Sequence, residues 1–313
     1  MSLRRRLLTF APFGAIAAVL AATFAIAGGG SAGSAGAAGI LRSVDRTSLP
    51  IGDGKVTYSG PREGYVYACQ NPGGPGGGAQ VEGPWIKEDG TFDKTAKPTV
   101  DGSVSWGSAR RKIWISKKKR VIEGNGLPVG NATGEYPVSP SDDAFRYDRN
   151  PNSVGSRSVK VSLSRHPKRA KQASCVPMGV IGYAKNGVAL FNALDALDRD
   201  AVAHEVQDRC EGHPQKESVY HYHSIPDCLT KKESKQKASG LVGYALDGFP
   251  IYGPRGNSGR ILTNDDLDAC HGKVGKVYFE GRWQRIYHYV STYEYPYTVG
   301  CFRGTPVTDF SGR

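Results

Sequence analysis

Four consecutive residues in the second half of the chain have the types and spacing of a metal site. They are Tyr220, His221, Tyr222 and His223. In a β-strand, alternate side chains share a face, so the two histidines would lie on one face and the two tyrosines on the other. Imidazoles whose Cα atoms are roughly 7 Å apart can turn toward one divalent cation. We therefore expect His221 and His223 to bind copper or zinc, both of which imidazole suits.

Further histidines are available to complete such a site. The triplet around His288 repeats the Tyr-His-Tyr pattern, and we expect His288 to be the third ligand. His213 and His271 are further candidates, whereas His166 and His204 are expected at the surface. The structural alternative is that buried histidines bond to one another, to a carboxylate such as Asp208 or Asp268, or to a backbone carbonyl.

The chain contains an internal repeat. Three blocks recur in the same order: residues 179–191 as 240–252, 208–212 as 268–272, and 220–222 as 287–289. Such recurrence is typical of a duplicated supersecondary unit. We infer two tandem pseudo-symmetric units, about 179–228 and 240–301. If the units pack as a pair, His288 would meet His221 and His223 at their junction.

Each unit has the signature of a β-hairpin. Asn186 and Gly187 in the first unit, and Asp247 and Gly248 in the second, stand between apolar runs. Such dipeptides supply the positive φ angles of a two-residue hairpin turn. Asp247 is therefore interpreted as a turn residue rather than a catalytic acid.

The six cysteines predict three disulfides. Their number is even, and no C-x-x-C pair that would favour a metal site is present. The repeat suggests that each unit closes its own bond, which leaves one bond near the N-terminal side. The predicted pairs are Cys210–Cys228, Cys270–Cys301 and Cys69–Cys175.

The N-terminus has the features of an export signal. Three arginines at 4–6 precede an uncharged apolar run that ends in Ala25, Ile26 and Ala27, small residues that suit signal peptidase. We expect a signal peptide at 1–27 and a Gly/Ser/Ala-rich linker at 28–43. The protein would then be secreted or extracytoplasmic, without a transmembrane anchor after cleavage. An uncleaved membrane anchor is the alternative.

The remaining pattern predicts a mainly β protein with a minor α part. Strands are expected at 64–69, 112–116 and 158–164, and a helix between 190 and 207. We expect one β-hairpin-rich, disulfide-stapled domain containing the two repeat units. A β-rich N-terminal extension would span 44–120, and a tail would span 307–313.

The net charge of +12 is interpreted as solvated surface charge. None of the basic clusters follows a nucleic-acid-binding motif, so anionic cell-envelope polymers or a protein partner are the expected contacts. No nucleophile motif, phosphate loop or dinucleotide fingerprint is present.

Between residues 121 and 306 the chain resembles the YHYH domain family, named after the tetrapeptide at 220–223. The resemblance also rests on the segments 125–128, 247–253, 287–289 and 295–304. It implies an exported bacterial protein and brings no established reaction.

Three functions are compatible with these features. The first is an exported domain that binds a divalent metal, copper or zinc, through a histidine cluster. The second is a metal-free extracellular module whose tyrosines and basic loops bind polysaccharide or protein. The third is a metalloenzyme, which requires an open coordination position and which a solvent-reachable cavity beside His221 and His223 would favour.

Overall fold

The computed structural model describes residues 43–71, 77–230, 234 and 237–312. The expected signal peptide at 1–27 lies outside them, as does all of the linker at 28–43 except its last residue. Within the described ranges, no helix is long and apolar enough to cross a membrane.

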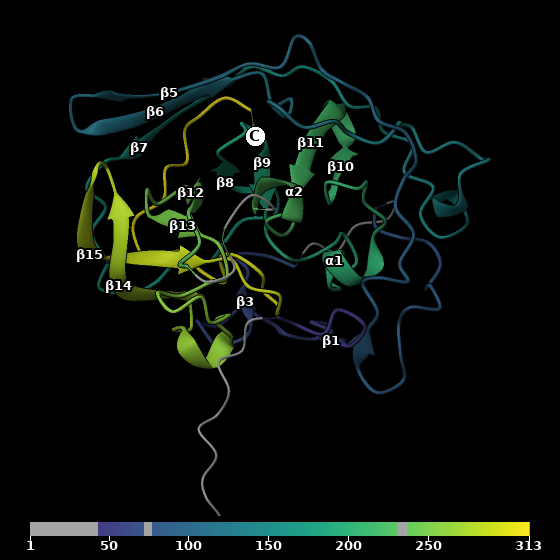
Figure 1. Cartoon of the computed structure of the whole chain (residues 1–313), viewed down its shortest axis with the longest axis horizontal. Coiled ribbons are helices and arrows are strands. Elements are labelled where there is room, and N and C mark those ends of the chain that lie inside the picture. Colours follow the sequence, from purple (N-terminus) through teal and green to yellow (C-terminus); the bar gives the residue numbers. More distant parts are fainter. Residues whose placement is uncertain (1–42, 72–76, 231–233, 235–236, 313) are drawn as a thin grey trace, which may run out of the picture. The chain divides into compact units, whose positions relative to one another are not determined.

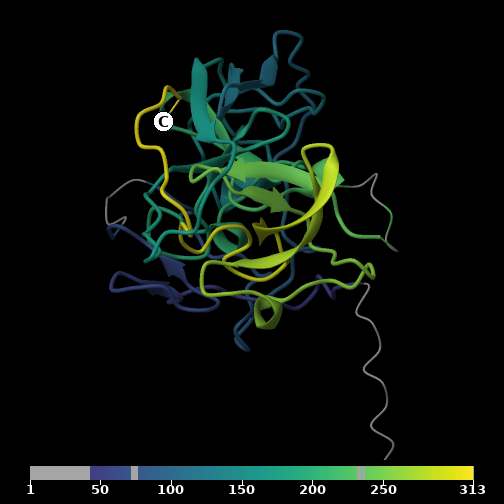
Figure 2. The ribbon, with the colours of Figure 1, turned by 90° about the vertical axis from the view of Figure 1, so that its left-hand side faces the viewer.

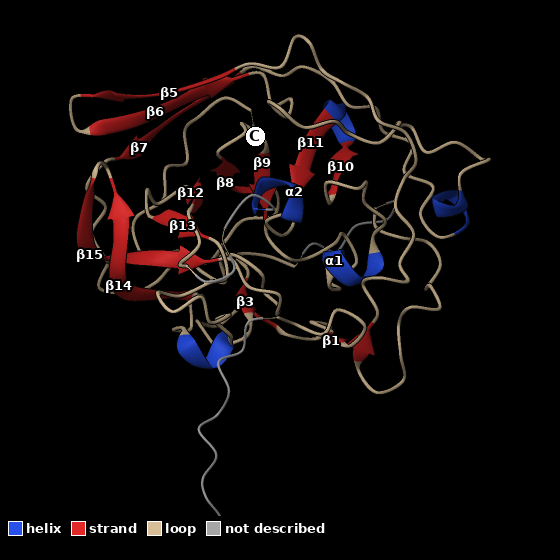
Figure 3. Cartoon of the chain, viewed as in Figure 1, coloured by secondary structure: helices blue, strands red, loops and turns tan. Residues whose placement is uncertain are grey.

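Strands and long loops dominate the structure, as Figure 3 shows. Within the described residues, the α-helices are the single turns α1 (Ala201–His204) and α2 (Asp227–Thr230). Short 3-10 turns occupy Asp143–Arg146, Lys216–Ser218 and Asn264–Asp266. The protein is therefore mainly β with few helices, as predicted.

The helix expected at 190–207 is wrong. Local side-chain bonds compete with helix formation there. The Asn192 side chain accepts from the backbone of Leu194, and the Asp195 side chain accepts from the backbone of Leu197. Only α1 remains helical, and Asp200 caps it by accepting from two backbone N–H groups.

The main sheet has eight strands in the order β10-β11-β9-β8-β12-β13-β15-β14 (Figure 1). Their bounds are β8 Val180–Ala184, β9 Ala189–Phe191, β10 Gly212–Gln215, β11 Val219–Tyr222, β12 Leu241–Ala245, β13 Pro250–Tyr252, β14 Gly272–Phe279 and β15 Arg282–Val290. The central strands β8 and β12 are antiparallel, with Tyr183 opposite Tyr244. Outward from them, both sides show an antiparallel, then a parallel, then an antiparallel pairing.

The hairpin turns lie where the sequence predicts them, but each loop has three residues instead of the predicted two. In the first, the backbone of Ala184 donates to Val188 and the backbone of Gly187 donates to Ala184, which leaves three loop residues. The equivalent bonds join Ala245 to Phe249 and Gly248 to Ala245. Of the two residues in each predicted dipeptide, only the glycine has a positive φ, which fits a three-residue loop ending in a glycine bulge.

Smaller sheets flank the main one. A three-stranded sheet joins β5 (Arg111–Ser116), β6 (Lys119–Gly124) and β7 (Val159–Ser164), and β7 has the alternating burial that its sequence predicts. Two-residue strands pair as β1 (Leu49–Pro50) with β4 (Thr91–Phe92), and as β2 (Val56–Thr57) with β3 (Val66–Tyr67). Figure 2 turns the molecule so that the side with the β5–β7 strands and the β14–β15 hairpin faces the viewer.

Three disulfides link the chain in the predicted pairs. Cys69–Cys175, Cys210–Cys228 and Cys270–Cys301 have Cα separations of 4.8, 5.6 and 4.5 Å. Residues of the N-terminal extension, such as Trp85 and Phe92, pack into the same hydrophobic core as the main sheet. The core therefore spans both parts of the described chain.

His204, His271 and His288 are buried, although His204 was expected at the surface. The Nε2 atom of His204 lies 2.8 Å from Asp53 Oδ2, so this histidine is part of the interior and not of the surface. His271 has a positive φ of 67°, and its Nε2 lies 3.0 Å from the Thr292 hydroxyl oxygen. Burial lowers the pKa of His271 to about 3.

This shift predicts an acid sensitivity that His271→Asn should reduce. A histidine whose pKa is lowered on folding favours the folded state above its unfolded pKa of roughly 6.5, and this contribution is lost as pH falls toward 3. When the pH is lowered from 7.5 to 5.5, the free energy of unfolding of the unmodified protein should fall by about 1.4 kcal/mol more than that of the variant. Asparagine tolerates the positive φ. Urea unfolding at both pH values measures the difference, and equal losses would contradict the expectation.

Candidate metal centre

Strand register brings three histidines onto one face of the sheet. His213 on β10 lies directly opposite His221 on β11. His223 follows β11 at the alternate position, so its side chain returns to the same side. The ring centroids are 4.5 Å apart for His213 and His221, 4.9 Å for His221 and His223, and 5.3 Å for His213 and His223.

Hydrogen bonds fix the orientation of two of these rings. The Nδ1 atom of His221 lies 3.1 Å from the Val219 carbonyl oxygen, and that of His223 lies 2.5 Å from the Asn192 carbonyl oxygen. Because a carbonyl oxygen only accepts, both Nδ1 atoms must donate, and both Nε2 atoms then carry a lone pair. These Nε2 atoms face each other at 3.1 Å. Two facing lone pairs repel unless a positive centre lies between them, which is the arrangement of two imidazoles on one metal.

Glu205, which was not among the expected ligands, joins the cluster. Its Oε2 atom lies 3.3 Å from His223 Nε2 and 3.4 Å from His213 Nε2. Among the described residues, neither that oxygen nor either ring nitrogen of His213 has a hydrogen-bond partner. Two ligands on a tetrahedral metal with bonds of 2.0–2.1 Å are separated by about 3.3–3.4 Å. The three measured separations are close to that value.

Burial keeps the cluster uncharged. It lowers the pKa of His213 and His221 well below the ordinary value and that of His223 to about 4. The neighbouring imidazoles add to this shift at His213. Burial likewise raises the pKa of Glu205, with further contributions from the nearby carboxylates of Asp148 and Asp195. The imidazoles are therefore held neutral, which is the form that binds metal.

The two tyrosines of the tetrapeptide have structural bonds on the opposite face. The Tyr220 hydroxyl donates to Asp208 at 2.8 Å, and the Tyr222 hydroxyl oxygen accepts from the Asn186 side chain at 3.0 Å. Phe191 stacks on the His221 ring with centroids 3.9 Å apart. Packing on both sides of β11 thus restrains the His221 and His223 side chains.

A cavity of about 670 Å³ opens beside the three histidines and Glu205. Asp148 and Asp195 contribute carboxylates to its lining, and Met178, Leu194 and Phe310 contribute apolar surface. Its volume lies within the roughly 300–1,000 Å³ of small-molecule sites.

The structure does not bring His288 to this cluster, contrary to the sequence-based expectation. Four strands lie between β11 and β15. The two strands are thus five inter-strand spacings apart, or about 24 Å at roughly 4.8 Å per spacing. The predicted units meet through β8 and β12, so the two Tyr-His-Tyr strands, β11 and β15, lie toward opposite ends of the strand order. The His288 ring instead packs edge-on against Tyr252, and His271 bonds to Thr292.

Of the candidates, the structure therefore groups His221 and His223 with His213 and leaves His288 and His271 apart. His213 was only a further candidate from the sequence, and the pairing of β10 with β11 is what places it opposite His221. No local pattern marks Glu205, because its position depends on the turn that follows α1.

One family model matches part of the chain. Residues 160–261 match the family model described as YHYH protein. The match runs from β7 to β13 and includes Glu205, His213, His221 and His223, but it ends before His288. No curated protein matches the chain. No solved structure matches it.

The hydrogen bonds of Tyr222 predict a structural role that is separable from the histidines. Tyr222→Phe should lower the free energy of unfolding by about 1–2 kcal/mol, because the Asn186 amide loses a buried acceptor. The three imidazoles should keep their positions. Urea unfolding measures the first effect, and histidine NMR shifts of the folded variant measure the second. Unchanged stability would contradict the proposed role.

Proposed function

We propose that this protein is an extracytoplasmic metal-binding protein in which His213, His221 and His223 hold one divalent cation, copper or zinc. The observation that carries the proposal is the 3.1 Å approach of His221 Nε2 to His223 Nε2 while both Nδ1 atoms donate to backbone carbonyls. Glu205 is the proposed fourth ligand. Its carboxylate would be deprotonated by the cation and would offset part of the charge.

The three disulfides support the proposed location. Such bonds persist in oxidising compartments and are rare in the cytosol, and all six cysteines of this chain are paired. The apolar N-terminal segment with its small-residue ending supports export in the same direction.

The ligand types favour copper or zinc over other ions. Imidazole suits both metals, and the intrinsic affinity order places copper(II) above zinc. A site of three imidazoles and one carboxylate lacks the oxygen-rich shell that calcium and magnesium prefer.

We further propose that the two halves of the sheet are repeat units of which only the first retains the site. In the second half, Lys273 stands opposite His288, as His213 stands opposite His221 in the first. Val290 occupies the place that corresponds to His223 in the repeat. Of the three corresponding positions only His288 is a histidine, so metal binding by that half is not expected.

Metal analysis of alanine variants tests the proposal. Protein folded in an oxidising host and loaded with zinc or copper should hold about one equivalent after dialysis. His213→Ala, His221→Ala and His223→Ala should each weaken binding by on the order of 100-fold or more, since second-shell changes alone cost roughly 10–100-fold. His288→Ala is the matched control, because it removes a buried imidazole from the corresponding strand, and it should retain the metal. Calorimetric titration and elemental analysis provide the readouts.

Two outcomes would overturn the proposed site. One is folded protein that binds neither metal, which would favour a metal-free binding module. The other is a His288→Ala variant that loses metal as completely as His221→Ala does. Melting curves of all four variants identify any that fail to fold.

A metalloenzyme is the second candidate, and the adjoining cavity is the observation that favours it. Catalytic zinc sites combine three protein ligands with one exchangeable position, and the cavity of about 670 Å³ beside the histidines could admit a substrate. In this case Glu205 would be a proton acceptor and not a ligand.

Anion binding separates these two roles of Glu205. If the metal has an open position, azide should shift the visible spectrum of copper- or cobalt-loaded protein in a saturable manner. In that case Glu205→Gln should keep the metal affinity within a few fold of that of the unmodified protein. If Glu205 is instead the fourth ligand, the same substitution should weaken metal binding far more. A spectrum that azide does not change would favour the closed four-ligand site.

A further inference from the structure

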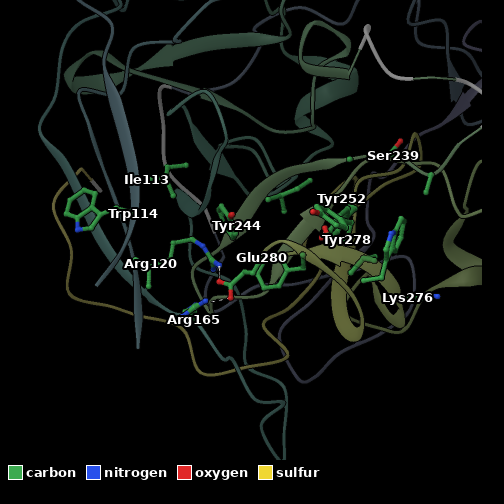
Figure 4. Close-up of a pocket in the computed structure, with 17 residues that line it drawn as sticks. Ile113, Trp114, Arg120, Arg165, Ser239, Tyr244, Tyr252, Lys276, Tyr278 and Glu280 are labelled. Carbon is green, nitrogen blue, oxygen red and sulfur yellow. Dashed lines mark hydrogen bonds and ion pairs between the residues drawn. The ribbon is translucent and has the colours of Figure 1, made fainter. Parts of the chain in front are cut away.

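A second cavity lies in the other half of the main sheet. Its volume is about 660 Å³, and it shares no lining residue with the histidine cavity. Its walls come from β5, β6, the β12–β13 hairpin and the β14–β15 hairpin. Figure 4 shows Trp114 and Lys276 at opposite sides, with Arg120 and Glu280 between them.

Exposed aromatic rings border this cavity. Tyr278 is 55% exposed and Trp283 is 57% exposed, and they pair directly across β14 and β15 with ring centroids 5.7 Å apart. Trp114 lines the same cavity from β5. Adjoining large aromatic side chains left in water commonly mark a binding surface. Their flat faces suit a ligand with a broad, weakly polar face.

The charged groups in the cavity favour an anion. Arg120, Arg165 and Lys276 line it, and Glu280 is its single carboxylate. Glu280 pairs with both arginines. The excess of basic groups is therefore not neutralised within the lining.

Arg120 supplies a built-in polar anchor. Its side chain is 2% exposed and stacks over Tyr244, with the guanidinium carbon 4.2 Å from the ring centroid. Among the described residues, its Nη1 atom has no hydrogen-bond partner. A buried guanidinium N–H without an acceptor is costly, and a ligand oxygen that enters the cavity would remove the cost.

We propose that this cavity binds an acidic saccharide, a sugar ring that carries a carboxylate. The C–H face of the ring stacks on Trp283 and Tyr278, and the carboxylate pairs with the free N–H of Arg120. Lys276 adds electrostatic attraction from a separate part of the cavity wall. The site is independent of the proposed metal centre.

Tryptophan fluorescence tests this site directly, because Trp114 and Trp283 border the cavity. Trigalacturonate should change the emission of the disulfide-bonded protein in a saturable manner, and neutral maltotriose should bind at least tenfold more weakly. Trp283→Ala and Lys276→Gln, both at exposed positions, should each weaken trigalacturonate binding by about tenfold. Trp106→Phe and Lys171→Gln are matched controls outside the cavity and should leave affinity unchanged.

Several results would overturn the assignment. These are the absence of saturable binding, equal affinity for the neutral sugar, unchanged affinity in both cavity variants, or tighter binding of a thymidine decamer. Because Lys276→Gln removes only an exposed charge, it keeps the test valid if Trp283→Ala unfolds. Treatment with EDTA should leave saccharide binding intact, which separates failure of this site from failure of the metal site.

Discussion

The whole structure depends on one close backbone contact, the antiparallel pairing of β8 with β12. Each strand places a glycine at this junction. A Cβ atom on Gly182 would lie 2.5 Å from the Tyr244 carbonyl oxygen, and one on Gly243 would lie 2.7 Å from that of Tyr183. Side chains at these positions would push the strands apart, so the repeated Gly-Tyr-Ala motif is explained by sterics. Without this contact the eight strands would separate into two groups of four.

This junction also determines where chemistry can occur. It joins the two halves through β8 and β12, so β11 and β15 lie far apart. Each half must therefore position any histidine site with its own strands, although segments from elsewhere in the chain also line both cavities. The first does so with His213, His221 and His223, whereas the second combines His288 with Lys273 and opens an aromatic, basic cavity beside Tyr252. By the sequence repeat, Tyr252 corresponds to Phe191, which stacks on His221. Equivalent positions, Phe191 in the first half and Tyr252 in the second, thus line two cavities whose other side chains differ.

Much of this arrangement could be predicted from the sequence because it depends on local rules. Alternation placed His221 and His223 on one face, strand patterning located β7, and the repeat suggested the three cysteine pairs. The helix expected near Leu194 failed because side-chain bonds of Asn192 and Asp195 form turns that a hydrophobic period does not reveal.

The rest of the candidate site required long-range information. The repeat indicated that two units pack together, but it did not indicate which strands form the contact. The choice of β8 and β12 excluded His288. Glu205 was missed because its position depends on the α1 turn, which Asp200 caps and which packs against the N-terminal segment: the Asp200 side chain accepts from the backbone of Gly52. No pattern within the repeat units encodes that contact.

The histidines are held in place by hydrogen bonds, ring stacking and a nearby disulfide. The rings of His221 and His223 are oriented by backbone carbonyls, and His221 is also stacked on Phe191. Cys210–Cys228 brackets β10 and β11, and the hydrophobic core continues on both sides of the junction. These interactions involve no metal, unlike small domains that fold only when their ligands are bound. A cation held here would therefore not be needed to build the fold, and its binding energy would remain available for recognition or chemistry in the adjoining cavity.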